Sequence, residues 1–248
     1  VAPYVVFGSM VLAAAIVPSM GTRLPMTAVA DGIALVGLLA TARVFIALAA
    51  MDVGTAFGTL GARREMMVGF LAEPALLMVS FVASLITQTT ALPAITEDLA
   101  TRPLALYPSL AFTGLAFTIV LLAENARIPV DNPATHLELT MIHEAMLLEY
   151  SARHLALMEW AAALKLFNYA CIGFALFVPW GVASGPASLA AVAASIAVLA
   201  LKLLCAGVVL AVIETVSAKL RIFRAPEFLA TAFLLAVLGL LVFLLLGG

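Results

Sequence analysis

The sequence predicts an all-α, polytopic integral membrane protein, a single transmembrane domain over residues 1–248 with about seven membrane-spanning helices. Composition is the first observation behind this class: 65% of the residues are hydrophobic and only 10% are charged, whereas a soluble domain is about 25% charged. The mean hydropathy is +1.20. The second is that apolar runs of about 20 residues, enough for a helix to cross the hydrocarbon core, recur along the chain. They are continuous, unlike the alternating strands of a membrane barrel.

Seven apolar segments are predicted as spans. The first is short and stops at Pro18, and the second carries Asp31 near its start and Arg43 inside it. The third has Glu73 and Pro74 in its first turns. In chain order the predicted spans cover residues 5–17, 31–50, 66–86, 110–123, 155–180, 187–216 and 228–246.

The segments between the spans are predicted mainly as loops. Residues 52–65 are polar and contain three glycines, which disfavour a stable helix. Residues 137–150 have a helical pattern but are too polar to face lipid. The chain starts at Val1 without an initiator methionine or a basic signal segment, so we expect it to begin inside a longer protein.

Basic residues orient the bundle. The loops on one side, at about 52–65, 124–136 and 217–227 together with Arg153, hold seven lysines and arginines, whereas those on the other side hold only Arg23 and Arg102. Short loops rich in lysine and arginine stay in the cytoplasm. The three named loops are therefore predicted to be cytoplasmic.

Residues 123–160 stand apart from the rest of the sequence. They contain six of the fourteen acidic residues and all three histidines, His136, His143 and His154. No second group of ligands accompanies the histidines, and Cys171 and Cys205 are isolated in apolar segments. Two such cysteines cannot hold a four-thiolate cluster, so we expect no metal and no cofactor in this chain.

Charged residues at membrane depth are rare and are usually paired or line a hydrated path. Two explanations stay open: buried ion pairs, such as Glu159 with Lys165 or Lys202 with Glu73, or a relay that passes protons between carboxylates. The relay is favoured because the carboxylates outnumber the buried cations, among which is Arg43. The predicted relay residues are Glu73, Glu138, Glu144, Glu149, Glu159, Lys165, Lys202 and Glu214.

A proline-bracketed turn at 127–133 begins the acidic stretch. Pro129 and Pro133 exclude a regular helix interior there. The turn is either a rigid connection between two spans or a surface on which a partner docks. The residues predicted to form such a surface are Arg63, Arg64, Glu124, Arg127, Asp131, Arg221 and Arg224.

The segment AENARIPVDNPATHLELTMIHEAMLLEYS, residues 123–151, resembles the junction subunit of respiratory complex I, called subunit 1, and its hydrogenase relatives. The family pattern is matched at Glu124, Arg127, Pro129, Asp131 and Glu138, and again at 149–151. The resemblance extends over almost the whole chain, except for the family's first helix. It implies a subunit of an oxidoreductase complex in a prokaryotic cytoplasmic membrane.

The departures from the complex I pattern favour one branch. Val130 replaces a phenylalanine, and the forms THLELTMIHEAMLLEYS and KLRIFRAPE resemble the integral membrane subunit of formate hydrogenlyase and hydrogenase-4 type hydrogenases. That branch implies a membrane anchor that docks hydrogenase small and large subunits and meets antiporter-like proton-translocating subunits. The nickel–iron site and iron–sulfur clusters would belong to those partners.

Two other functions remain possible from the sequence. A complex I junction subunit would share the relay and add a quinone site. A free-standing transporter would be expected to show an inverted repeat or a pair of broken helices, and the sequence shows neither.

Overall fold

The computed structural model describes residues 1–22, 26, 29–103, 107–131, 141–183, 189–218, 220 and 224–246. Those ranges form a bundle of helices with no strand among the described residues. In chain order the helices are α1 (Ala2–Ile16), α2 (Gly32–Val53), α3 (Ala56–Thr87), α4 (Leu92–Thr101), α5 (Pro108–Glu124), α6 (His143–Leu147), α7 (Ala152–Phe177), α8 (Leu189–Val216) and α9 (Ala225–Leu246).

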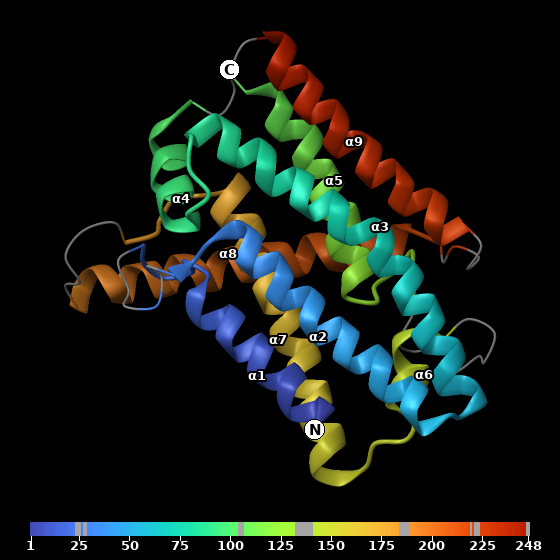
Figure 1. Cartoon of the computed structure of the whole chain (residues 1–248). Coiled ribbons are helices and arrows are strands. Elements are labelled where there is room, and N and C mark those ends of the chain that lie inside the picture. The colour runs from blue at the N-terminus through green and yellow to red at the C-terminus, as the bar shows by residue number, and fades with distance from the viewer. Residues whose placement is uncertain are drawn as a thin grey trace.

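The helical membrane bundle predicted from composition is confirmed. Five helices, α2, α3, α7, α8 and α9, are long and apolar enough to cross a membrane, and α1 and α5 are shorter apolar helices. Together they correspond to the seven predicted spans. The core forms where α3 packs against α2, α5 and α9, and α1 packs against α2 and α7. Figure 1 shows α3 running diagonally through the bundle, with α8 crossing it at an angle.

The first of the loops predicted to be cytoplasmic is shorter than expected, because residues 56–65 belong to α3. Gly54 turns the chain with a φ of 72°, and the Thr55 hydroxyl caps the new helix by accepting from the Gly58 amide at 3.2 Å. A Cβ on Gly61 would lie 2.8 Å from the Ile142 carbonyl oxygen. Gly61, one of the glycines that argued against a helix, therefore lets α3 pack closely against the segment that starts α6.

The predicted helix at 137–150 is also shorter. Among its described residues only His143–Leu147 form a helix, α6, and residues 137–140 lie outside the described part of the chain. This helix lies against the first turns of α3. Packing against α3 thus replaces the lipid contact for which the segment is too polar.

The opposite end of the bundle is tied by a capped helix start. Asp31 caps α2 by accepting hydrogen bonds from the amides of Ile33 at 2.8 Å and Ala34 at 3.3 Å. The Thr90 hydroxyl, just before α4, donates to the same carboxylate at 2.5 Å. The bond from Thr90 holds the pKa of Asp31 below its ordinary value, although partial burial opposes the shift.

Candidate functional site: a charge network inside the bundle

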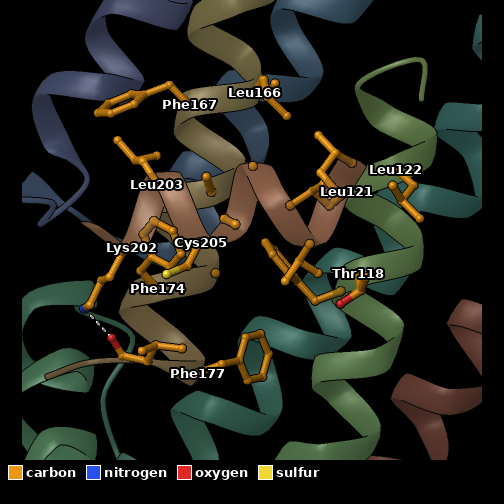
Figure 2. Close-up of a pocket in the computed structure, with 18 of the residues that line it drawn as sticks. Thr118, Leu121, Leu122, Leu166, Phe167, Phe174, Phe177, Lys202, Leu203 and Cys205 are labelled. Carbon is orange, nitrogen blue, oxygen red and sulfur yellow. Dashed lines mark hydrogen bonds between the residues drawn. The ribbon is translucent and has the colours of Figure 1, made fainter. Parts of the chain in front are cut away.

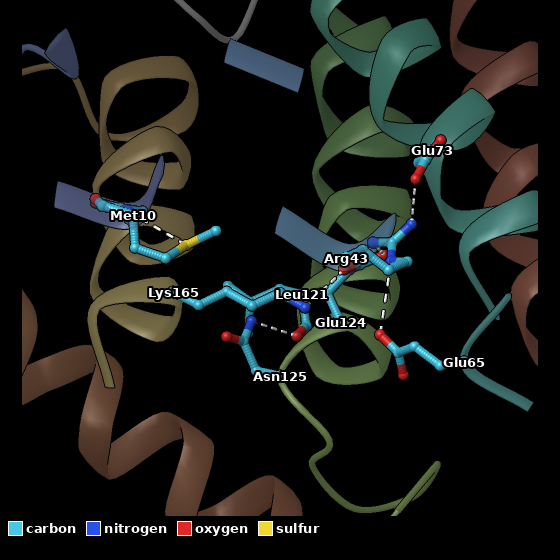
Figure 3. A network of polar contacts seen from close by, with 9 residues as sticks. Met10, Arg43, Glu65, Glu73, Leu121, Glu124, Asn125 and Lys165 are labelled. Atoms are coloured by element: carbon cyan, nitrogen blue, oxygen red, sulfur yellow. Dashed lines mark hydrogen bonds and ion pairs between the residues drawn. The ribbon is translucent and has the colours of Figure 1, made fainter. Parts of the chain in front are cut away.

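Arg43 is the centre of a buried ion-pair network. Its guanidinium, 4% exposed, projects from α2 toward three carboxylates on two other helices. Nη1 lies 2.5 Å from Oε1 of Glu73, and Nε lies 3.5 Å from Oε1 of Glu65, both on α3. Nη2 pairs with Glu124 at the end of α5. Figure 3 shows Arg43 between these side chains.

Gly69 explains how a long cation fits between α2 and α3. A Cβ at this position would lie 2.8 Å from Cδ of Arg43 and 3.1 Å from its Cζ. Gly69 is four residues after Glu65 and four before Glu73, so the three positions share one face of α3. The α3 face therefore supplies two acids and, between them, the gap through which Arg43 passes.

Glu124 connects this cluster to α7. Its side chain is buried, and Oε2 lies 3.0 Å from Nζ of Lys165. Tyr169, one helical turn further along α7, is also buried and interacts electrostatically with Glu124 and Arg43. A buried carboxylate is tolerated when opposite charges and hydrogen bonds replace its hydration. Two cations from two helices meet that requirement here.

The network carries one negative charge when every member is ionised, since Glu65, Glu73 and Glu124 face Arg43 and Lys165. It can therefore accept one proton on a carboxylate and become neutral while both cations stay charged. The three carboxylates differ in access: the Glu73 side chain is 35% exposed, that of Glu65 10% and that of Glu124 1%. Glu73 is the most exposed of the three.

A small cavity borders the network on the side of α6. Its volume is about 20 Å³, and its polar lining is formed by Arg43, Glu65, His143 and Lys165. About 10–15 Å³ is enough to hold one water molecule. Burial lowers the pKa of His143, while the nearby carboxylates Glu65, Glu144 and Asp131 oppose that shift. The cavity thus places a titratable imidazole and a network carboxylate around one water-sized space.

The proline turn is fixed to the same region by hydrogen bonds. The Asp131 carboxylate is 3% exposed and accepts from the amides of Ile142 at 3.3 Å and His143 at 3.4 Å. Arg64 on α3 donates from Nη1 to the Met141 carbonyl at 2.7 Å. The start of α6 is therefore held between the turn and α3.

On its other side the turn contacts the chain around α8 and α9. Arg127 Nη1 lies 3.5 Å from Oε1 of Glu214 near the end of α8. The amide of Leu220 donates to the Pro129 carbonyl at 2.8 Å. These contacts connect the turn to the segment that precedes α9.

The structure brings together some predicted relay residues and separates others. Glu73 and Lys165 join the network, whereas Glu149 and Glu159 are exposed and Glu144 lies on α6 beside His143. The predicted pairs were wrong: Lys165 pairs with Glu124 rather than Glu159, and Glu73 pairs with Arg43 rather than Lys202. Lys202 and Glu214 lie on α8, outside the network; Lys202 donates to the Val178 carbonyl at 2.6 Å and Glu214 pairs with Arg127.

Some of the predicted docking residues are exposed and others are buried. Arg63 and Arg224 are exposed and Arg127 is half-buried. Glu124 and Asp131 were predicted on a surface, and the structure corrects this: both side chains lie inside, where they pair and hold backbone amides. Glu138 and Arg221 lie outside the described residues.

Two network residues, Arg43 and Glu65, and the cavity residue His143 are missing from the predicted set. Arg43 could have been recognised from the sequence, because a lone cation in an apolar span requires carboxylates on other helices. The regular spacing of Glu65, Gly69 and Glu73 was hidden by the assumption that a glycine-rich segment forms a loop. No group of three potential metal ligands occurs in the part of the chain that the structure describes.

Comparisons with known proteins cover nearly the whole chain. A sequence model of the family described as NADH dehydrogenase matches residues 1–245. Hydrogenase-4 component C of Escherichia coli strain K12 is 35% identical over 240 residues, which cover 96% of this chain and 74% of that protein. Formate hydrogenlyase subunit 4 of the same strain is 31% identical over 229 residues, which cover 91% of this chain and 72% of that protein.

A solved structure has the same fold. A chain of the membrane-bound sulfane sulfur reductase, an archaeal respiratory membrane complex, matches with a TM-score of 0.80 and 19% sequence identity. The match covers 97% of this chain and 77% of that chain. At this identity the likeness concerns the arrangement of the helices.

Proposed function

The chain belongs to the NADH dehydrogenase family, as a membrane subunit similar to subunit 1 of complex I, and from this premise we propose that it is the junction subunit of a membrane-bound hydrogenase complex. In this role it anchors the hydrophilic hydrogenase subunits to the cytoplasmic membrane and relays protons toward antiporter-like subunits. The observation that carries the proposal is the buried Arg43 network, which has one more carboxylate than cations.

The hydrogenase branch is supported by the two curated relatives, one a hydrogenase-4 component and the other a formate hydrogenlyase subunit. Under this proposal the nickel–iron site and iron–sulfur clusters reside in the partner subunits. The chain's own contribution is to bind those partners and to hold and move protons at named carboxylates.

The docking surface would be formed by the exposed Arg63 and Arg224 together with the half-buried Arg127 of the proline turn. Arg63 precedes Arg64 on α3, Arg127 lies in the turn and Arg224 lies at the start of α9. Exposed guanidinium groups suit acidic or carbonyl-rich surfaces, because each presents a planar set of donors. A partner seated here would press on the turn and on the start of α6.

The proton path proposed from this geometry starts at α6 and ends at Glu73. A proton arriving near Glu144 and His143 would cross the small cavity to Glu65 and then move within the network to Glu73, the most exposed of its acids. Arg43 remains protonated throughout and lowers the energy of the ionised carboxylates. Each transfer moves one proton and changes no other bond.

The test uses the intact complex in vesicles, with hydrogenase turnover and proton uptake measured together. Glu65→Gln and Glu73→Gln remove one titratable site each at nearly constant volume, and we expect fewer protons moved per turnover in both variants. Glu159→Gln is the matched control, since this glutamate is exposed on α7 and outside the network. Normal coupling in both network variants, with normal assembly, would remove these residues from the path.

A quinone-site junction subunit of an NADH:quinone oxidoreductase is the second candidate, favoured by the description of the matching family. The two candidates differ in the substrate of the complex. Quinone reductase activity in the purified complex, without hydrogenase subunits, would support the second candidate and refute the first.

A further inference from the structure

A large apolar groove lies on the opposite side of α7 from the charge network. Its volume is about 620 Å³, and it is bounded by α5, α7 and α8. Figure 2 shows Leu121 and Leu122 of α5 across from Phe174 and Phe177 of α7, with Leu203 and Cys205 on α8. The volume falls within the ~300–1,000 Å³ typical of sites for small organic ligands.

Weak packing of α8 creates this groove. In the most apolar stretch of α8 only 6% of the residues are buried inside the protein, whereas 50% are buried in the corresponding stretch of α3. Figure 1 shows α8 crossing the bundle rather than lying along it. Its inner side therefore leaves a hollow against α5 and α7 that the chain itself does not fill.

Among the residues that the structure describes, Lys202 is the one charged side chain that lines the groove. Its ammonium donates to the Val178 carbonyl at 2.6 Å and lies 5.7 Å from the centre of the Phe174 ring. No carboxylate of the described residues forms an ion pair with it. An ammonium group has three donors, so two remain for a ligand that brings negative charge.

Lys202 lies beside the end of α7, a helix long enough to span a membrane. In sequence it lies in the middle of α8, but in space it lies beside Val178, the residue that ends α7. Trp180 follows two residues later and is 51% exposed, and tryptophan gathers at membrane–water interfaces. The loop residues Pro18 and Gly181 lie around the same lysine. The crossing angle of α8 thus brings a mid-helix lysine to the end of α7, close to an exposed tryptophan.

We propose that this groove binds one anionic phospholipid. An acyl chain lies between α5, α7 and α8, and the phosphate accepts hydrogen bonds from the Lys202 ammonium group. The lipid fills the hollow behind α8 and supplies the missing counter-charge. Lys202 lies outside the Arg43 network, so the lipid site does not rest on the proposed proton path.

Cys205 provides a reporter inside the groove, because it is exposed there while Cys171 is buried. A fluorophore is attached to Cys205 in the intact complex, and the complex is placed in bilayers that mix phosphatidylglycerol with phosphatidylcholine. Either lipid carries brominated acyl chains, which quench the fluorophore on contact. The same complex with Cys205→Ser measures signal from labels on other subunits.

We expect brominated phosphatidylglycerol to quench about fivefold more effectively than phosphatidylcholine at equal mole fraction, the preference that one interfacial lysine supplies. Lys202→Gln should reduce the ratio to about one, and Lys202→Arg should retain it, since charge near the phosphate sets the preference. Equal quenching by the two lipids in the wild-type complex would overturn the proposal, leaving only the ordinary acyl shell around the protein.

Absence of quenching by either lipid would also overturn it, because the groove would then be filled by a helix of another subunit. A label-free measurement guards against disturbance by the fluorophore. Native mass spectrometry of the complex should detect phosphatidylglycerol retained with wild-type protein and one molecule fewer with Lys202→Gln. Equal retention by both proteins contradicts the assignment of the phosphate to Lys202.

Discussion

Replacing Gly69 with alanine tests whether close packing of α2 against α3 holds the Arg43 guanidinium in place. The new methyl group would lie 2.8 Å from Cδ and 3.1 Å from Cζ of Arg43, well inside the ~3.5–4.0 Å optimum for carbon contacts. Arg43 is 4% exposed and ion-paired on three sides. It cannot relieve the overlap without lengthening some of those ion pairs.

Two effects of opposite sign determine the result. Alanine is favoured over glycine inside a helix by about 1 kcal/mol. Overpacking a filled interior destabilises by about 1–3 kcal/mol, and disrupting a buried ion pair adds up to about 3–5 kcal/mol if a charge loses its partner. Overpacking minus the alanine gain leaves ~0–2 kcal/mol, and weakening of the ion pairs adds about 1 kcal/mol more, so Gly69→Ala should destabilise the chain by about 1–3 kcal/mol.

Gly37→Ala is the matched control, because Gly37 lies on α2 and a Cβ there meets nothing within 4 Å. It should be neutral or stabilising by up to about 1 kcal/mol, since only helix propensity changes. Unfolding is followed in the intact complex by the reaction of buried Cys171 with a thiol reagent on heating, in a Cys205→Ser background. If Gly69→Ala and Gly37→Ala unfold at the same temperature, Gly69 does not determine the position of Arg43.

Three further perturbations probe other parts of the bundle. Glu124→Leu alone should destabilise the chain by about 3–5 kcal/mol, because Lys165 loses its carboxylate partner, whereas adding Lys165→Met should recover part of the loss. Additive losses of the two substitutions in the same cysteine assay would contradict the pairing. Asp31→Ala should remove about 1 kcal/mol by losing the α2 cap. Because the bond from Thr90 lowers the pKa of Asp31, the contribution of Asp31 should be present above about pH 4 and fade below it, seen as convergence of wild-type and variant unfolding temperatures. Burial lowers the pKa of His143, so the free energy of unfolding should fall as the pH drops below about 6.5, the ordinary pKa of histidine. His143→Gln should flatten that pH dependence, and an unchanged profile would show that His143 does not cause it.

The sequence was sufficient for the class of fold because lipid imposes a simple rule: each span needs a long apolar run. It was less informative about where α3 begins. The glycines of 52–65 weaken a helix in water, but here Gly61 allows close contact with residues that are distant in sequence, such as Ile142. The helix propensity of the local sequence cannot predict that contact.

For the candidate site too, the sequence identified some residues but not the contacts that they make across the fold. The sequence identified Glu73 and Lys165 as costly charges inside the membrane, which follows from desolvation alone. It could not determine their partners, because pairing depends on which helices are neighbours. Glu124 was assigned to the surface since it ends a span, yet α7 covers that end and brings Lys165 to 3.0 Å.

Under the proposed function, the stiffness of the contacts around α6 determines which residue passes a partner's movement to the network. The amides of Ile142 and His143 lie 3.3 and 3.4 Å from the Asp131 carboxylate, beyond the ~2.7–3.2 Å range of well-formed hydrogen bonds. The bond from Arg64 to the Met141 carbonyl is shorter, at 2.7 Å, and its donor is charged. Arg64 is also adjacent to Glu65 on α3.

A partner that displaces Arg64 would therefore move the start of α6 and the lining of the cavity together. Displacement of the proline turn would act through the longer and weaker contacts. Under the proposed function we therefore expect a partner's movement to reach the network through Arg64 and α3, while the turn helps to hold the surface on which the partner sits.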